Sequence, residues 1–325
     1  MAILAIQFPN EELKIYEGKW HAEKLENLKD DHFFITDFTK DKMYFFEKEK
    51  EIDVFTDENL SFNDDGSVFF VNGRYYLQGL EIFIDYFQEN DIQKAIYSRI
   101  KEVERGKQPV FETLKALAAT YSKEALVYLA SDEKFGTWVG ATPEVLVQGD
   151  EEKLYSMALA GTKAEESTAW TEKEEVEHQY VVDYVKEKIS AHSPKDLTVF
   201  PTETVKNGAV YHLRTNYEFQ IESNKWNALI NDMHPTPAVC GTPMEKAQAY
   251  ILEMEPHERA FYAGLIGWKG EEDLKVYVNL RCMQILQTKY ALYLGGGITK
   301  DSDIGAEWRE TEAKSETLLA VINKD

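Results

Sequence analysis

Runs of aromatic and β-branched residues, separated by clusters of turn-forming residues, limit the folds open to this chain more than any other feature of its sequence. Within the first 78 residues, such runs stand at 32–38, 43–46 and 67–71, with Asp, Asn, Gly and Lys between them. Branched and aromatic side chains favour strands because they pack well on a pleated, half-buried surface. Residues 1–78 are therefore predicted to form short strands and turns.

The rest of the chain mixes strand patterns with helical ones. Apolar residues recur at helical spacing in 111–118, 176–189, 244–254 and 304–322. Strand patterns occupy 125–130, 135–139, 145–147, 153–159 and 209–221, and a hairpin is predicted from 275–286 and 290–294, ended by glycines 295–297. Long strands joined by occasional helices predict an α+β fold, in which large mixed or antiparallel β-sheets are layered with helices.

The length and the balance of residues suit one sizeable core. Of the 325 residues, 43% are hydrophobic and 29% are charged, which is ordinary for a globular chain. The length could hold two average domains or one large one. Because no proline- or serine-rich linker divides the chain, a single domain is predicted over 1–325, with a β-rich part at 1–90 and the remainder at 91–325.

The charge balance argues against nucleic acids and membranes as partners. The chain has 58 Asp and Glu against 36 Lys and Arg, a net charge of -22, and such a field repels nucleic-acid phosphates and anionic lipid. Two cysteines, Cys240 and Cys282, are too few for a disulfide scaffold and fit a reducing compartment. There is no basic leader and no run of ~18 apolar residues, so a cytoplasmic protein is predicted.

Two of the predicted helices carry paired carboxylates. Glu307, Glu310 and Lys314 share one face of the last helix, because residues three and four apart are neighbours on a helix. Glu174 and Glu177 repeat the arrangement beside the helical pattern at 176–189. Two such pairs could meet at a hard cation such as Mg²⁺, which prefers oxygen ligands. The same spacing also arises on solvated helix faces, where Glu310 and Lys314 would form a simple ion pair.

Turn segments supply further candidates for a preorganised site. Segment 140–144 follows a strand and places Glu144 just after a turn, and segment 158–162 ends another strand with a small, open backbone. Segment 234–243 is rich in proline and rigid, which serves shape but also preorganises sites. Glycines 295–297 are not followed by the G-K-[ST] of a phosphate loop, so they favour a turn or a close backbone approach.

Taken in order, these segments resemble the chorismate-utilising enzyme family, which includes isochorismate, salicylate, anthranilate and aminodeoxychorismate synthases. The resemblance rests on the order and spacing of the segments at 94–99, 140–144, 158–162, 174–178, 234–243, 261–264, 279–281, 295–298 and 307–314. It implies the fold of the anthranilate and aminodeoxychorismate synthases and a strand over 94–99. Residues 1–90 are shorter than is usual for the family.

Three residues indicate which members of the family the chain resembles most. Lys94 stands where the ammonia-using members resemble one another in carrying glutamine, and Ala160 stands where aminodeoxychorismate synthases carry lysine. Ala238 is similar to the isochorismate synthases, whereas lyases and amino-transferring members tend to have threonine there. The resemblance is therefore closest to isochorismate synthases of menaquinone or siderophore type. A salicylate synthase and a non-catalytic, metal-binding relative remain the alternatives.

The resemblance implies chorismate as substrate and roles for three catalytic residues. Lys94, as a neutral amine, would be the general base that activates water for addition at C2. Glu144 would be the general acid that protonates the departing C4 oxygen. His234 would lie near the C4 hydroxyl, although a histidine that only caps a proline-rich turn is the other interpretation.

The resemblance also implies a Mg²⁺ ion and a substrate pocket. Glu177 and Glu310 would be its direct ligands, with Glu174 and Glu307 behind them through waters. The substrate-binding residues would be Gly161, Thr162, Ala238, Tyr262, Arg281, Gly297 and Lys314. Other members of the family suggest a monomer.

Overall fold

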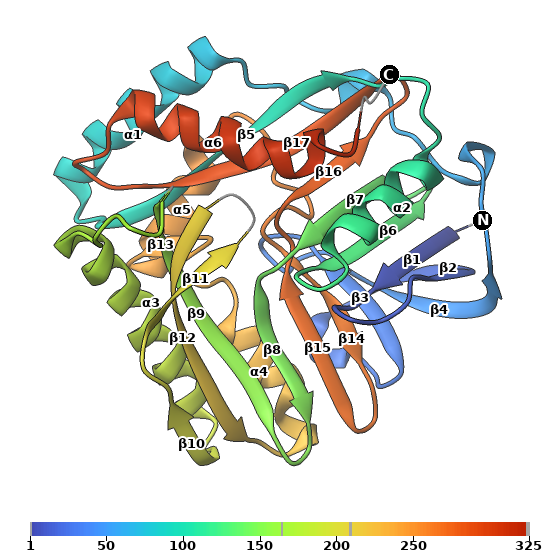
Figure 1. Ribbon diagram of the computed structural model, residues 1–325, viewed down its shortest axis with the longest axis horizontal. Coiled ribbons are helices and arrows are strands. Elements are labelled where there is room, and N and C mark those ends of the chain that lie inside the picture. The colour runs from blue at the N-terminus through green and yellow to red at the C-terminus, as the bar shows by residue number, and fades with distance from the viewer. Residues whose placement is uncertain (1, 164, 208–209, 323–325) are drawn as a thin grey trace.

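The structure, a computed structural model, describes residues 2–163, 165–207 and 210–322 (Figure 1). Its helices are α1 (Gly73–Asn90), α2 (Val110–Tyr121), α3 (Glu172–Ala191), α4 (Trp226–Met233), α5 (Met244–Met254) and α6 (Ile304–Leu319). Its strands are β1 (Ala2–Gln7), β2 (Lys14–Glu23), β3 (His32–Thr36), β4 (Met43–Ile52), β5 (Lys94–Glu104), β6 (Leu126–Asp132), β7 (Gly136–Thr142), β8 (Val145–Asp150), β9 (Leu154–Lys163), β10 (Lys195–Val199), β11 (Glu203–Asn207), β12 (Val210–Gln220), β13 (Gly241–Thr242), β14 (Leu265–Lys269), β15 (Asp273–Val278), β16 (Cys282–Ile285) and β17 (Lys289–Ile298).

One continuous ladder of antiparallel pairs links these strands. Its order is β12–β9–β8–β15–β14–β3–β4–β2–β1–β6–β7–β16–β17–β5–β13, with β10 and β11 paired to the outer side of β12. Strands β9 and β5, which lie near the two ends of this order, both reach one cavity. The predicted α+β fold, with a large antiparallel sheet and helices, is thus confirmed.

Two chain segments run side by side from one half of the ladder to the other. One joins β7 to β8 through Glu144, and the other joins β15 to β16 through Arg281. The Val278 N–H donates to the Glu144 carbonyl oxygen at 2.9 Å, and the Ala141 N–H donates to the Arg281 carbonyl oxygen at 3.1 Å. Because these bonds tie the two segments together, Glu144 and Arg281 are held beside each other.

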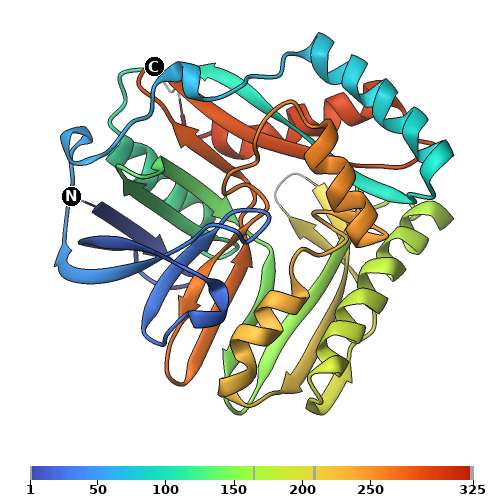
Figure 2. The same ribbon diagram turned by 180° about the vertical axis from the view of Figure 1, so that it is seen from behind.

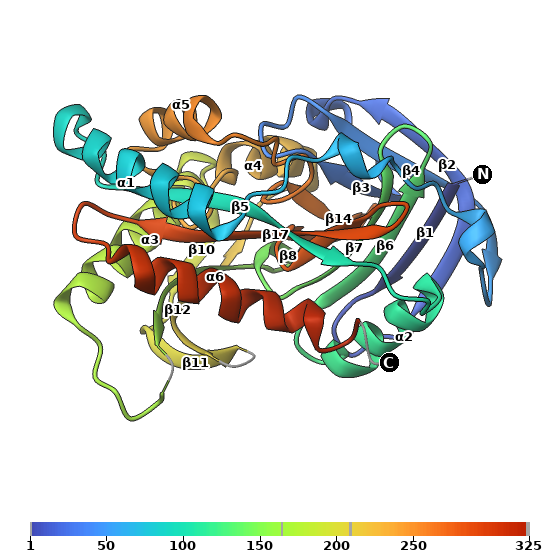
Figure 3. The ribbon, with the colours of Figure 1, turned by 90° about the horizontal axis from the view of Figure 1, so that it is seen from above.

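Helices cover the ladder near both of its ends. α6 lies along β17, α5 packs on β5, and α3 packs on β9 (Figure 3). Figure 2 shows α3, α4 and α5 together on one side of the molecule, while α2 covers β6 and β7. Within the described ranges, no helix has the length and apolar character that a membrane span requires.

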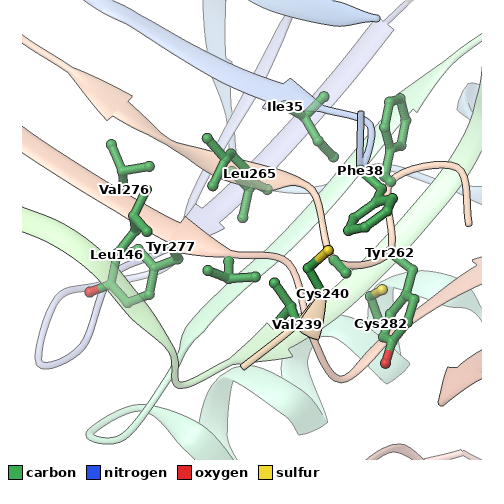
Figure 4. Close-up of a cluster of buried hydrophobic side chains, with 14 of the residues drawn as sticks. Ile35, Phe38, Leu146, Val239, Cys240, Tyr262, Leu265, Val276, Tyr277 and Cys282 are labelled. Atoms are coloured by element: carbon green, nitrogen blue, oxygen red, sulfur yellow. The ribbon is translucent and has the colours of Figure 1, made fainter. Parts of the chain in front are cut away.

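Alternate residues of the central strands pack into two different cores. In β1, Leu4 and Ile6 belong to the main core, whereas Ile3 and Ala5 belong to a second core under α2. All six residues of β1 are buried because both faces of the strand are covered. The main core, part of which Figure 4 shows, also contains Phe34 of β3, so the N-terminal strands are integral to it.

The structure corrects the sequence-based prediction in four segments. The hairpin strand predicted over 275–286 is two strands, β15 and β16, and only β16 pairs with β17. Residues 73–78, expected among strands and turns, begin α1, which Asn72 caps by accepting a hydrogen bond from the Tyr75 N–H at 3.1 Å. Residues 67–71 form no strand. Glycines 295–297 do not end a strand but continue β17, because each pairs with a residue of β5.

We predict that Phe34→Ala destabilises the protein strongly, because the Phe34 side chain is fully buried in the main core. Large-to-small changes of this kind cost about 3–5 kcal/mol, from lost burial and from the cavity left behind. Urea unfolding measures the free energy. Phe69→Ala is the matched control, since Phe69 is 51% exposed, and equal losses in the two variants would contradict the position of β3.

Candidate active site

A cavity of about 130 Å³ lies where the two ends of the strand ladder meet. Its wall comes from β5, β9, β12 and β17, from both crossing segments, and from α3 and α6. The members of the predicted site that line it are Lys94, Glu144, Gly161, Glu177, Ala238, Tyr262, Arg281, Gly297, Glu310 and Lys314. The fold therefore brings most of the predicted residues together from distant parts of the chain.

Gly297 allows a charged pair to lie directly on β17. A Cβ atom at this position would stand 2.7 Å from Cε of Lys94 and 3.5 Å from Oε1 of Glu177. The first distance is well inside van der Waals contact, so any side chain here would displace the lysine. This close approach explains the glycine stretch that the sequence alone left open.

Two lysines are paired with carboxylates inside the cavity. Lys94 Nζ donates to Glu177 Oε1. Lys314 Nζ lies 2.7 Å from Glu310 Oε1 and donates to the carbonyl oxygen of Gly295 at 2.9 Å. The charge of Lys314 lowers the pKa of Glu310, with a further contribution from Lys94, so Glu310 is ionised at neutral pH.

The Glu144 carboxyl group is poised to carry a proton. Burial raises the pKa of Glu144 to about 7, although the charges of Lys314, Lys94 and Arg281 act to lower it. Because desolvation outweighs these three charges, a large fraction of the group is protonated near neutral pH. A carboxyl group with such a pKa can act as a general acid under physiological conditions.

Arg281 and Tyr262 form the polar wall beside Glu144. Arg281 adopts a left-handed backbone conformation with φ 48°, and its Nη1 donates to the Lys314 carbonyl oxygen at 3.3 Å and to Thr317 Oγ1 at 3.2 Å. Burial lowers the pKa of Arg281, but a guanidinium stays charged in proteins. The Tyr262 hydroxyl would lie 2.7 Å from a Cβ at Gly295. This wall offers hydrogen-bond donors suited to a carboxylate.

Three carboxylates lie near the glycines of β17. Glu177 reaches Gly297, as described above, and a Cβ at Gly296 would lie 3.2 Å from Glu307 Oε2 and 3.8 Å from Glu310 Oε1. Carboxylate oxygens are the ligands that Mg²⁺ prefers. Across the part of the chain that the structure describes, no three acidic, histidine or cysteine side chains already form a ligand set. Glu177 and Glu310 each face a lysine instead.

Glu174 is engaged at the start of α3. Its Oε2 accepts hydrogen bonds from the Thr171 N–H at 2.8 Å and the Thr171 hydroxyl at 3.0 Å, which completes a capping box. Glu174 would have to leave this cap before it could support Glu177. Thr162 lies in β9, and its side chain is outside the described residues.

His234 takes a different place from Lys94 and Glu144, the other two predicted catalytic residues. His234 is buried but does not line the cavity; its carbonyl oxygen accepts a hydrogen bond from Lys40 Nζ. Burial lowers the pKa of His234 to about 3, and the charge of Lys40 adds to the effect, so the ring is neutral. Its role near the C4 hydroxyl stays a prediction, and so does the other interpretation, in which the histidine only caps the proline-rich turn.

His212, which is not among the residues predicted from the sequence, also lines the cavity. It lies on β12, and its Nδ1 is 2.6 Å from the carbonyl oxygen of Gly161 on β9. Burial lowers the pKa of His212 to about 4, so the imidazole is neutral at pH 7. No spacing pattern marks this residue, because only the pairing of β12 with β9 brings it to the site.

The fold and the cavity define a chorismate binding enzyme, and the chain belongs to that family: the family model matches residues 68–323. The chain is 29% identical over 263 residues to the vibriobactin-specific isochorismate synthase of Vibrio cholerae serotype O1, a match that covers 77% of this chain and 67% of that protein. It is 32% identical over 201 residues to the isochorismate synthase EntC of Escherichia coli K12, covering 58% of this chain and 51% of EntC. The matches thus span about half to two thirds of these curated relatives.

Solved structures share the fold over nearly the whole chain. A putative 2,3-dihydroxybenzoate-specific isochorismate synthase, DhbC from Bacillus anthracis, superposes with a TM-score of 0.82 at 24% identity, covering 98% of this chain and 95% of that one. Anthranilate synthase component I from Streptococcus pneumoniae superposes with a TM-score of 0.70 at 18% identity, covering 97% of this chain and 89% of that one. The predicted family and its fold are therefore confirmed.

We predict that one glutamate of the native protein titrates near pH 7 and that Glu144→Gln removes this titration. Carboxyl-carbon NMR of protein labelled on glutamate measures it. Because the pKa of Glu144 is higher in the folded state than in the unfolded state, the protonated group stabilises the folded protein. This contribution is complete at a pH below the unfolded-state pKa and is lost as the pH rises through about 7. The amide variant should therefore lose less stability between pH 5 and 8. A wild-type midpoint below pH 5 would contradict the burial argument.

Proposed function

We propose that the chain is an isochorismate synthase, an isomerase that adds water at C2 of chorismate and releases the C4 hydroxyl to give isochorismate. The observation that carries the proposal is that one cavity holds both Lys94 and a Glu144 with a pKa of about 7. The two curated relatives described above are isochorismate synthases, which supports the same reaction. One of them is vibriobactin-specific by name, and a further relative is the isochorismate synthase MenF of Pasteurella multocida. We therefore propose that the product serves menaquinone or siderophore biosynthesis.

The proposed chemistry needs a base for water and an acid for the leaving group. Lys94 would take a proton from the attacking water, and it must be neutral at that moment, so its contact with Glu177 must be broken during turnover. Glu144 would give its proton to the C4 oxygen. The neutral His212 at the same wall donates its Nδ1–H to the Gly161 carbonyl oxygen, so its Nε2 could accept a hydrogen bond from the ring hydroxyl.

The two substrate carboxylates would be held by separate parts of the wall. Arg281 and Tyr262 offer donors for the enolpyruvyl carboxylate, and the guanidinium fork suits a carboxylate in a bidentate manner. The ring carboxylate would lie toward Glu177 and Glu310. A Mg²⁺ ion bound by these two residues would supply a positive charge that draws electrons from C2. Glu307 and, once released from its cap, Glu174 would support it through waters.

Ala160 and Ala238 support the release of intact isochorismate. Both residues line the cavity. Ala160 has no amine that could attack the substrate, and Ala238 has no hydroxyl beside the ring. A small apolar group gives the enolpyruvyl chain no added hydrogen bond that would favour its elimination. We also propose that the protein works as a cytoplasmic monomer.

We predict that purified protein with chorismate and Mg²⁺ at neutral pH yields isochorismate, with little salicylate or pyruvate. Chromatography of the products measures this without any added lyase. Lys94→Ala should lower kcat by about 10²–10⁴-fold, the usual contribution of a general base. Pyruvate formed in step with chorismate loss would make the enzyme a salicylate synthase, and no consumption of chorismate would contradict the proposed function.

We predict that turnover stops in excess EDTA and returns with Mg²⁺, because Glu177 and Glu310 would be the direct ligands. Calorimetry should detect Mg²⁺ binding to the wild type, weakened at least about tenfold in Glu310→Gln, since even outer-shell changes cost roughly 10–100-fold. Glu316→Gln is the matched control, because Glu316 is exposed on the same helix. Full turnover in EDTA, or equal affinities in the two variants, would contradict the metal assignment.

A further inference from the structure

The inner end of β5 has a backbone edge that no long strand covers. On one side, β5 pairs with β17 from Ala95 to Glu104. On the other side, β13 pairs only with Lys94 and Ala95, and the Cys240 carbonyl oxygen then accepts a hydrogen bond from the Ile96 N–H at 2.8 Å. Beyond that point the edge is buried, so its remaining N–H and C=O groups need partners of another kind.

A buried ion pair supplies two of these partners, and the Val71 N–H supplies another by donating to the Ile100 carbonyl oxygen at 2.9 Å. Arg259 Nη2 donates to the Ile96 carbonyl oxygen at 2.8 Å, and Glu255 Oε1 accepts from the Ser98 N–H at 2.7 Å. The two side chains also bond each other at 2.7 and 2.8 Å, and each is only 3% exposed. The pair therefore continues the hydrogen-bond ladder of β5 where the neighbouring strand has ended.

The same arginine reaches the opposite segment of the cavity wall. Its Nη1 donates to the Val239 carbonyl oxygen at 3.0 Å, and its guanidinium lies 5.9 Å from the ring centre of Tyr262. Figure 4 shows Val239 and Cys240 close to Tyr262 in one buried cluster. Ile96, Val239 and Tyr262 all line the cavity, but Arg259 and Glu255 do not.

We propose that Glu255 and Arg259 form a positioning pair, which fixes the segment of Lys94 relative to the segment of Ala238 and thereby sets the rate and the product of the reaction. The inference rests on the proposed function. Ile96 lies two residues from Lys94 on the same face of β5, and Val239 follows Ala238 directly. Any change in the length or geometry of the Arg259 fork alters the spacing between these two segments.

Stability alone is a weaker explanation for this pair. Taking two charges out of water costs free energy that their attraction only partly returns, and well-packed apolar residues often stabilise a core as well or better. A planar guanidinium has a use that apolar groups lack, because it holds two carbonyl oxygens and a carboxylate in one plane. The four bonds that fix backbone and carboxylate groups here exploit that geometry.

Arg259→Lys tests the proposal, since it keeps the charge but loses the fork. We expect kcat to fall by about 10–100-fold, because small misplacements of reacting groups reduce rates by this order. The KM for chorismate should change less than threefold. The fraction of pyruvate and salicylate among the products should rise. Arg105→Lys is the matched control, because Arg105 also bonds a carboxylate, Asp57, and a backbone carbonyl, that of Leu286, outside the cavity wall.

Glu255→Asp is the milder second variant, for use if Arg259→Lys does not fold. It keeps both charges but draws the carboxylate back from the Ser98 N–H, so a smaller loss of kcat in the same direction is expected. Losses of kcat that match those of Arg105→Lys at equal thermal stability, with an unchanged product ratio, would overturn the proposal for either variant.

Hydrogen exchange separates this proposal from the proposed function. The amide protons of Ile96 and Ser98 should exchange faster in Arg259→Lys and Glu255→Asp than in the wild type, and not in Arg105→Lys. Inactive wild-type protein with this exchange pattern would remove the proposed function but keep the positioning of β5. Unchanged exchange would overturn the positioning itself, whatever the activity.

Discussion

The pairing of β17 with β5 through a stretch of glycines is the constraint on which the cavity depends. The register sets Gly297 opposite Ile96 and continues to the far end of β5. A shift by one residue would turn every side chain of the strand to its other face, and Lys94 would then leave the cavity. Because Lys94 Cε lies only 2.7 Å from the point where a Cβ of residue 297 would be, the position of the lysine depends directly on the strand pairing.

Charge balance inside the cavity differs from that of the whole chain. The protein carries a net charge of -22, yet Lys94, Lys314 and Arg281 all act on the single carboxyl of Glu144. Two of these cations are already matched by Glu177 and Glu310. A substrate with two carboxylates would compete for the same lysines, so binding and the separation of these ion pairs would be linked.

The sequence predicts which motifs lie close together in space more readily than it predicts the backbone elements that carry them. Most of the residues that line the cavity could be predicted from the order of the motifs, because each motif has a recognisable chemical composition. Helices such as Met244–Met254 were predicted to the residue, since an apolar pattern follows a proline. Residues 73–90 were missed because aromatic residues suit strands and helices alike. Residue spacing does not predict that His212 lines the cavity and His234 does not, because strand pairing decides which histidine faces the cavity.

Control of the product would follow from the same backbone. Ala238 differs from threonine by two heavy atoms, and such a change matters only if the segment that carries it is held rigidly against the ring site. The Val239 carbonyl oxygen and the Cys240 carbonyl oxygen are both fixed, one by Arg259 and the other by the Ile96 N–H. The segment after Ala238 is thus tied to β5 at two successive residues. A side chain on this segment would be able to favour release over elimination because two hydrogen bonds hold the backbone beneath it.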